Sequence, residues 1–301
     1  MTTVRPYRSS APARRGDFVQ LLHAEWTKFR TVRGWVAGMI VAVLVIVGFG
    51  LFVSGGGVKP SGTKTGACPP GMSSAQCGSA AVSLGTPENT IALYLIGTFA
   101  GLIVVAVVAT MFMSAEYRRG LIRTTLAASP IRGRVLAAKA IVIGAVAFVT
   151  GLAAAGGAVL FATGLAHHRG LSVLAVRWPT ELRVIAGTAA LIAVAAVFTL
   201  AIAAIVRRSG ATVTIAIVTV VFPYFLSISN GGAAGVTDFL LRVTPAAAFA
   251  VQQPTPQYYL AVTSPATGFF PLAPWAGFAV LCGWTVLALV LAAYLLRRRD
   301  A

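Results

Sequence analysis

Long runs of apolar residues, separated by short polar and basic segments, dominate the sequence. Six runs reach the length of about 20 residues that a helix needs to cross a bilayer. They cover residues 35–53, 90–113, 140–163, 184–206, 211–229 and 274–296. The runs are apolar on every side, whereas a surface helix of a soluble protein keeps one polar face. The pattern predicts a single all-α integral membrane domain, residues 1–301, with six transmembrane helices.

Lysine and arginine are unevenly distributed over the segments between these runs. The chain has 24 of them against 7 acidic residues, a net charge of +17. Eighteen lie at the two termini and after the second and fourth spans, and only 6 lie in the remaining segments. Cytoplasmic segments carry the excess of Lys and Arg in membrane proteins. We therefore expect a cell-membrane protein with both termini in the cytoplasm and residues 54–89 and 230–273 outside, and no nucleic-acid partner.

The segment before the first span divides into two parts. Residues 1–16, rich in Arg, Pro and Ser, predict a disordered tail. Residues 17–33 have apolar side chains at helical spacing, which predicts an amphipathic helix in the inner membrane interface, against lipid. The side chains on its apolar arc are Phe18, Leu22, Trp26 and Phe29. We expect Trp26 at the depth of the lipid headgroups.

Glu25 interrupts this arc, because its carboxylate projects onto the apolar side. A carboxylate in that position needs a partner, either a cation of this chain or a docked protein. Alternatively, the side chain extends to water or pairs with Lys28, three residues further along the helix. The sequence leaves these alternatives open.

Charge is concentrated between the second and third spans, in residues 114–134. If residues 114–126 are helical, one face is polar and carries a glycine that allows another backbone to approach. A Ser-Pro pair then begins a second helix that leads into the third span. The residues of these two helices that we single out are Glu116, Arg118, Arg119, Gly120, Arg123, Ser129, Pro130 and Arg132. The pattern predicts a helical hairpin at the cytoplasmic surface, suited to docking; the simpler interpretation is that its arginines only fix the topology.

The two long outer segments differ in composition. Residues 54–89 are rich in Gly, Ser, Thr and Pro and predict a loop. Cys68 and Cys77 lie in this loop, where an oxidising compartment allows a disulfide, with free thiols as the alternative. Residues 230–273 predict short helices at or dipping into the outer surface, one of them starting at Thr244-Pro245 with the threonine as cap.

The chemistry of the spans excludes several classes of protein. No Asp, Glu, Lys or Arg lies in the middle of any span, although ion-coupled transporters generally need such groups. The three histidines lie outside the spans, so we predict no metal site, no cofactor and no catalytic group. No phosphate-binding loop is present in a suitable context, so we do not expect this chain to hydrolyse ATP.

Small residues and one proline suggest how the spans pack. Gly34 and Gly38, like Gly97 and Gly101, are spaced four residues apart, which permits close helix contacts. The contacts are either within the chain or at the seam of a dimer. Pro223 is expected to kink the fifth span.

The basic hairpin has a recognisable order of motifs. Glu116 and Gly120 form E-x-x-x-G, and Thr125-Leu126, Ser129-Pro130 and then Arg132 follow. This order resembles the coupling-helix region of the type-two exporter permeases of ABC transporters. Residues 24–35, with Glu25, Trp26 and Lys28, resemble the connecting helix of actinobacterial members of that family. Residues 244–253, 271–284 and 295–301 resemble their last outer loop, sixth span and tail.

The resemblance implies a function that the residues alone do not. Permeases of this family have six spans, form homodimers or heterodimers, and dock two cytoplasmic ATPase subunits that carry the nucleotide sites. The chain is then expected to form the translocation pathway of an exporter, with the hairpin transmitting ATPase movement to the spans. The alternative is a membrane scaffold or sensor subunit without transport of its own.

Overall fold

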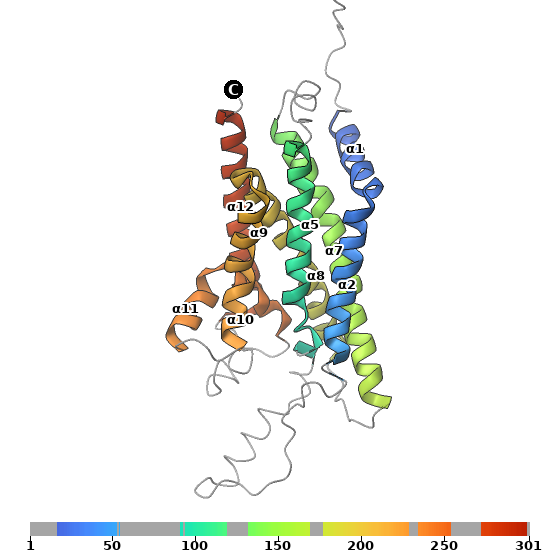
Figure 1. Ribbon diagram of the computed structural model, residues 1–301. Helices are drawn as coiled ribbons and strands as arrows, with labels where there is room; N and C mark the ends of the chain where they lie inside the picture. The colour runs from blue at the N-terminus through green and yellow to red at the C-terminus, as the bar shows by residue number, and fades with distance from the viewer. Residues whose placement is uncertain are drawn as a thin grey trace, which may run out of the picture.

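The computed structural model describes residues 17–52, 54, 91–92, 94–118, 132–168, 177–228, 234–253 and 272–299. Every regular element in these ranges is a helix (Figure 1). Six helical segments are long and apolar enough to cross a membrane, which confirms the predicted number. The chain is therefore an all-α integral membrane protein. The predicted tail and the loop with Cys68 and Cys77 lie outside the described residues.

The spans are α2, α5, α7, α8, a composite of three helices, and α12. Their bounds are Arg33–Phe52 for α2, Thr98–Arg118 for α5, Arg132–His168 for α7, Trp178–Val206 for α8 and Pro274–Arg299 for α12. The composite span joins α9, Ser209–Ala216, to η2, Ile217–Val221, and α10, Phe222–Ile228. The second span starts later than the sequence predicted, because a turn at residues 95–97 precedes α5.

The helices outside the spans whose bounds the described residues give are α1, Asp17–Thr31; α11, Ala234–Val243; and η3, Pro245–Gln252. Helix α1 lies at the same end of the bundle as the last turns of α5 and α12 and the first turns of α7 (Figure 1). We call this the α1 end. Helices α11 and η3 lie at the opposite end, which we call the η3 end.

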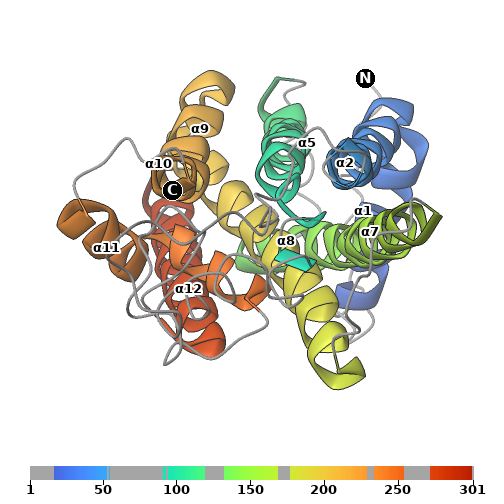
Figure 2. The same cartoon turned by 90° about the horizontal axis from the view of Figure 1, so that it is seen from below.

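Helix α8 occupies the middle of the bundle, with α5 and α7 on one side and α12 on another (Figure 2). It contacts all three of these helices and also α9. Alanines fill most of its central turns and are buried, as at Ala196 and Ala201. Small side chains let neighbouring helices approach closely, which is how helices associate where lipid replaces water.

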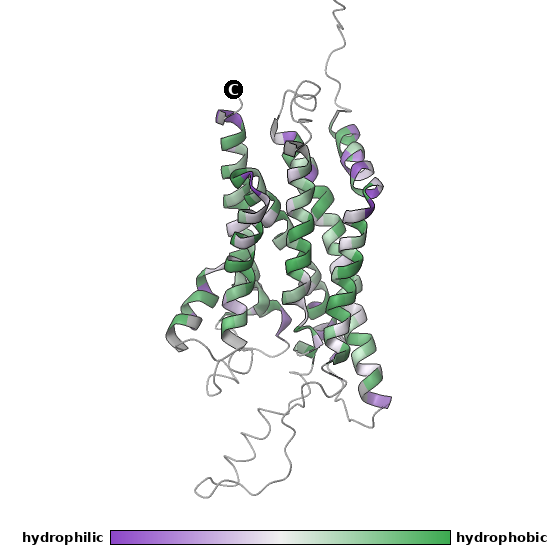
Figure 3. Ribbon diagram, in the orientation of Figure 1, coloured by the Kyte–Doolittle hydropathy of each residue, from purple (hydrophilic) through white to green (hydrophobic). Residues whose placement is uncertain are grey.

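Hydrophobic residues run along the middle of the helices, and hydrophilic ones gather near their ends (Figure 3). The hydrophilic colour is clearest on α1 and at the C-terminal end of α12. Large apolar side chains are exposed on the outer sides of several spans, for example Leu44 on α2, Leu160 on α7 and Val290 on α12. In a bilayer these surfaces face lipid, so their exposure does not require a protein partner.

Gly97, in the turn before α5, and Gly101, on α5, are used for packing within the chain. A side chain at Gly101 would begin 2.5 Å from Ile46 of α2, and one at Gly97 would begin 2.6 Å from Phe49 Cβ. Gly38 on α2 in turn faces Val108 of α5 at 2.5 Å, whereas Gly34 has open space around it. The close packing of α2 against α5 therefore depends on three glycines, and the intrachain alternative is confirmed for them.

The expected kink at Pro223 appears as a change of helix type. The five residues of η2 form a π-helix, and α10 begins at Phe222, one residue before the proline. Proline has no N–H to donate, and its ring clashes with the carbonyl four residues earlier. A π-helical turn moves that carbonyl out of α-helical register. The fifth span thus crosses the bundle as two α-helical pieces separated by one widened turn.

The segment before α12 dips into the protein. All eight residues of η3 are buried, whereas Val236 and Phe239 of α11 are exposed. The predicted helix start at Thr244-Pro245 is correct, and Thr244 stands at the N-cap position, but its side chain does not cap the helix. The Thr244 hydroxyl makes no cap bond and donates backwards to the Leu240 carbonyl at 2.7 Å. The helix that follows is also a 3₁₀ helix, whose i to i+3 bonds suit short connecting elements.

Candidate coupling site

The predicted hairpin lies between α5 and α7, and the structure describes the two helices that lead into it. Glu116 and Arg118 are in the last turn of α5, and Arg132 is the first residue of α7. Their side chains lie outside what the structure describes. So do the remaining singled-out residues as a whole, which are Arg119, Gly120, Arg123, Ser129 and Pro130. The hairpin itself thus stays a prediction, and the site is built here from the helices that flank it.

Glu25 of α1 is completely buried and holds two lysines. Its Oε2 lies 2.6 Å from Nζ of Lys139, 114 residues away on α7, and its Oε1 lies 2.6 Å from Nζ of Lys28. The expectation that Glu25 needs a cation of this chain is confirmed, and the alternative that it extends to water is wrong. The pairing with Lys28 is also present, so two of the proposed partners act together.

The two lysines differ in exposure. The side chain of Lys139 is 2% exposed, whereas that of Lys28 is 40% exposed. Lys139 also lies over the ring of Phe112 on α5, with Nζ 4.4 Å from the ring centroid, a favourable cation–π distance. Lys139 therefore connects α7 to α1 through an ion pair and to α5 through an aromatic ring, away from water.

The ring of Phe112 belongs to a cluster of three aromatic rings. Phe112 of α5 packs edge-on against Phe29 of α1 at 5.6 Å and against Trp35 of α2 at 5.1 Å. Phe29 and Trp35 lie 5.9 Å apart. Edge-to-face aromatic pairs contribute about 0.5–1.5 kcal/mol beyond their buried area. Helices α1, α2, α5 and α7 thus meet at one point, which we call the α1 junction: Glu25, Lys28, Phe29, Trp35, Phe112 and Lys139.

The α1 junction fixes the rotation of α1 about its own axis. Only one rotation places the Glu25 carboxylate on Lys139, because the remaining faces of α1 carry other side chains. Removing one member of a buried ion pair costs about 3–5 kcal/mol, since the other charge is left unpaired in a low-dielectric environment. The pair therefore holds α1 in one orientation against α7 more strictly than apolar contacts do.

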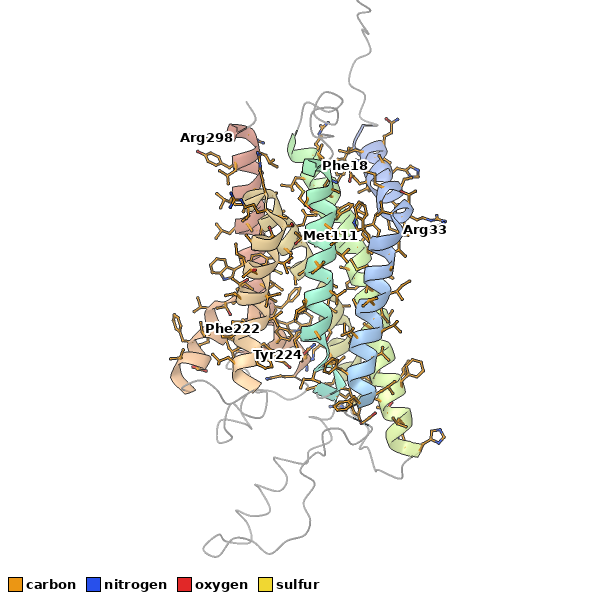
Figure 4. All side chains as sticks on the ribbon, viewed as in Figure 1. Phe18, Arg33, Met111, Phe222, Tyr224 and Arg298 are labelled. Carbon is orange, nitrogen blue, oxygen red and sulfur yellow. The ribbon has the colours of Figure 1, made fainter. Side chains whose placement is uncertain are left out.

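The packed face of α1 differs in one respect from the predicted apolar arc. Trp26 is 45% exposed and does not join the junction, while Glu25 and Phe29 are buried. Figure 4 labels Phe18 at the start of α1 and Arg33 just after its end, and Arg33 points away from the bundle. Glu25 is thus part of the packed face, and Trp26 lies on the side turned away from the other helices.

Lys139 is the residue of this site that the sequence did not single out. It appeared there as one of several basic residues after the hairpin. A signal was present, because Leu136, Lys139 and Ile143 share a helix face on which the two neighbours are apolar. All three are buried in the structure. A lysine flanked by apolar residues at i−3 and i+4 needs a buried anion, and the sequence offered Glu25.

The junction carries no catalytic chemistry. Its groups are one carboxylate, two ammonium groups and three aromatic rings, without a nucleophile placed on a base. Among the described residues, no group of three or more His, Cys, Asp or Glu side chains is arranged to hold a metal ion. What the arrangement can do is mechanical: it ties a peripheral helix to three spans, α2, α5 and α7.

Six spans, a charged junction at one end and a buried helix at the other define a multi-pass membrane protein. The sequence matches the model of the ABC-2 family transporter proteins over residues 20–301. The chain therefore belongs to this family and is a permease of an ABC transporter. No curated protein and no solved structure matches the sequence.

Proposed function

We propose that the chain is the permease subunit of an exporter and that a separate cytoplasmic ATPase subunit drives it. Members of the family generally work with such an ATPase. The predicted hairpin between α5 and α7 is the docking element, with Glu116, Arg119 and Arg123 on its polar face. Its partner is a homologous permease, either a second copy or a different chain, because two ATPase subunits need two hairpins.

The α1 end is the cytoplasmic end of the plasma-membrane protein in this proposal. Eighteen of the 24 lysines and arginines belong to the segments at that end, in agreement with the rule that cytoplasmic segments are basic. A reporter fused after Arg207, between α8 and α9, should report a cytoplasmic position. A reporter at that site facing the outside would contradict the orientation and with it the docking side.

One observation carries the coupling role: the α1 junction braces both helices that enter the hairpin. Phe112 lies about one helical turn before Glu116 on α5, and Lys139 lies about two turns after Arg132 on α7. Force applied to the hairpin therefore reaches α5 and α7 at points already tied to each other and to α1. A loop without such a brace would absorb the movement instead of passing it on.

The decisive experiment tests partner and coupling together. A candidate ATPase subunit is co-expressed with the permease, the complex is purified, and ATP hydrolysis is measured in liposomes with and without the permease. We expect hydrolysis that depends on the permease and that falls in Glu25→Gln by about 2- to 30-fold, the effect of losing 0.5–2 kcal/mol of coupling. An ATPase variant without its phosphate-loop lysine is the negative control for ATP hydrolysis.

The outcomes separate the proposal from the alternative. A complex that forms but shows no permease-dependent hydrolysis indicates a scaffold or sensor subunit. Loss of activity in Glu25→Gln together with loss of the complex indicates that the junction serves assembly. Direction is tested in everted membrane vesicles with a panel of amphipathic fluorescent dyes, where ATP-dependent uptake indicates export and uptake only by right-side-out vesicles contradicts it.

A further inference from the structure

The helix η3 is held in the bundle as a wedge between α8 and α12. A side chain at Gly277 of α12 would overlap the Ala247 carbonyl oxygen, and one at Gly187 of α8 would overlap the Val251 side chain. Tyr224 of α10 stacks on the ring of Phe249 at 3.9 Å with an interplanar angle of 10°. η3 therefore fills the η3 end of the bundle, with direct contacts to three surrounding helices.

The C-terminal end of η3 is fixed by hydrogen bonds. The Gln252 side-chain amide donates to the Thr98 hydroxyl at 3.0 Å and, more weakly, to the Thr188 hydroxyl at 3.4 Å. All three side chains are buried. The Arg183 guanidinium donates to the next carbonyl, that of Gln253, at 2.7 Å. These hydrogen bonds connect the C-terminal end of η3 to α8 through Thr188 and Arg183. They connect it to α5 through Thr98.

The two bonds of the Gln252 amide differ in how much movement they tolerate. A donor–acceptor separation much beyond 3.5 Å is no longer a hydrogen bond, so the bond to Thr188 is already near its limit. The bond to Thr98 is at normal length and breaks if Thr98 moves by about 0.5–1 Å. Of the contacts that hold η3, the bond to Thr98 is therefore the one that a small movement of α5 breaks.

Thr98 is the first residue of α5, and the last turns of α5 belong to the α1 end. The helix has 21 residues and spans about 31 Å. Phe112, near its other end, lies under Lys139 in the α1 junction. An α-helix of this length moves nearly as a rigid body, so a shift at the junction displaces Thr98 as well.

We propose that η3 is a movable seal at the η3 end of the permease, and that the Gln252–Thr98 hydrogen bond is the latch that a shift of α5 releases. The latch is neutral, so breaking it leaves no unpaired charge in the bundle. Both hydroxyl and amide have access to other partners after release, since threonine can bond its own helix backbone. These properties suit a contact that opens and closes repeatedly.

The latch is tested by chemical access to a buried position in η3. Ala248 is 1% exposed, and Ala248→Cys is introduced into a variant in which Cys68, Cys77 and Cys282 are replaced by alanine. The full-length permease is placed in nanodiscs, where a charged maleimide reaches both sides, and the labelling rate is measured. We expect Thr98→Val, which removes the acceptor but keeps the shape, to raise that rate about fivefold, the shift that loss of one hydrogen bond produces.

Two control variants keep this test decisive. Thr285→Val removes an equally buried hydroxyl, but one that bonds only the Leu281 carbonyl of its own helix, and we expect parent-like labelling. Thr98→Ser keeps the hydroxyl, and it should also label like the parent. Equal rates in Thr98→Val and the parent, or an increase in Thr285→Val as large as in Thr98→Val, would overturn the latch.

The link between the latch and transport rests on the proposed function, and a separate labelling experiment tests it. With the ATPase bound and ATP present, Ala248→Cys should label faster than in the absence of nucleotide. If Thr98→Val labels faster but ATP has no effect, the latch exists and the proposed drive by an ATPase is wrong. If ATP accelerates labelling while Thr98→Val does not, the drive is supported and the Gln252–Thr98 bond is not the latch.

Discussion

The two ends of the bundle fasten a peripheral helix to the spans by different means. At the α1 end, α1 is attached by a buried ion pair between Glu25 and Lys139, with the ring of Phe112 against the lysine. At the η3 end, η3 is attached by neutral hydrogen bonds from Gln252 and by close packing on two glycines. Breaking a buried ion pair costs about 3–5 kcal/mol, whereas a neutral hydrogen bond contributes about 1 kcal/mol.

The difference in strength matches a difference in role. An attachment of several kcal/mol keeps its geometry while force passes through it, which a docking end requires. The Gln252–Thr98 hydrogen bond by itself contributes about 1 kcal/mol, so its loss costs the η3 end much less than loss of the ion pair costs the α1 end. The molecule therefore has a strongly fastened α1 end and a more weakly fastened η3 end, and α5 connects the two.

The largest expected effect is at the α1 end. Glu25→Gln removes the charge that pairs with Lys139, and the free energy of unfolding should fall by about 3–5 kcal/mol. Denaturant unfolding of the purified protein in micelles measures this. Asp238→Asn is the matched control, because it breaks an exposed ion pair with Arg242 and should cost about 0–1 kcal/mol. Similar losses of stability in both variants would show that the buried ion pair of the α1 junction contributes no more than an exposed one.

The next effect tests the fit of η3. Gly277→Ala places a methyl group against the Ala247 carbonyl and should destabilise the protein by about 1–3 kcal/mol, a typical cost of overpacking. It should also raise the labelling of Ala248→Cys, because η3 must shift. Gly283→Ala on the same helix has open space around it and should be neutral or slightly stabilising. A Gly277→Ala protein as stable as Gly283→Ala would show that η3 is not wedged.

A smaller effect separates the two lysines of the junction. Lys28 is partly exposed, so Lys28→Met should lower stability by only about 0–1 kcal/mol. Lys139→Met makes the same chemical change at a buried position and should cost at least twice as much. The same unfolding assay measures both variants. Equal losses would mean that Glu25 is held by the nearer lysine and that the link between α1 and α7 contributes little.

The smallest effect on stability belongs to the hairpin. Glu116→Gln should change the free energy of unfolding by less than about 1 kcal/mol, as for an exposed ion pair, yet permease-dependent ATP hydrolysis should fall about tenfold. Arg119→Ala should act in the same way, and the double variant should lose less than the sum of the two if the residues pair. If Glu116→Gln keeps full permease-dependent ATP hydrolysis, the charges of the hairpin only fix the topology.

The six spans could be predicted because length and apolarity decide whether a helix crosses a bilayer. Glu25 was also identifiable, since a carboxylate on an apolar helix face always needs a counter-charge. Its principal partner was not, because Lys139 lies 114 residues away and its contact depends on how α1 packs against α7. Sequence periodicity describes one helix at a time and does not show which faces meet.

The η3 end was predicted less well for a related reason. The segment around Thr244-Pro245 gave a helix start, but neither the 3₁₀ form nor the burial of all of η3 followed from it. Burial there depends on Gly187 and Gly277, which lie on two other helices and are unremarkable in the sequence. The late start of α5 at Thr98 was missed because the residues before it are equally apolar.

The π-helix in the fifth span has a consequence for the phase of that span. A π-helical turn adds one residue to the turn, so α10 is rotated by about 100° relative to an uninterrupted continuation of α9. Tyr224, labelled in Figure 4, is 6% exposed in this phase and stacks on Phe249 of η3. Phe222, two residues earlier, is 51% exposed. Deleting a single residue between Ile217 and Val221 would rotate α10 back by about 100° and swing Tyr224 off η3, and it would also bring the Pro223 ring against the carbonyl four residues earlier. The widened turn therefore accommodates the proline and sets the contact with η3 at the same time.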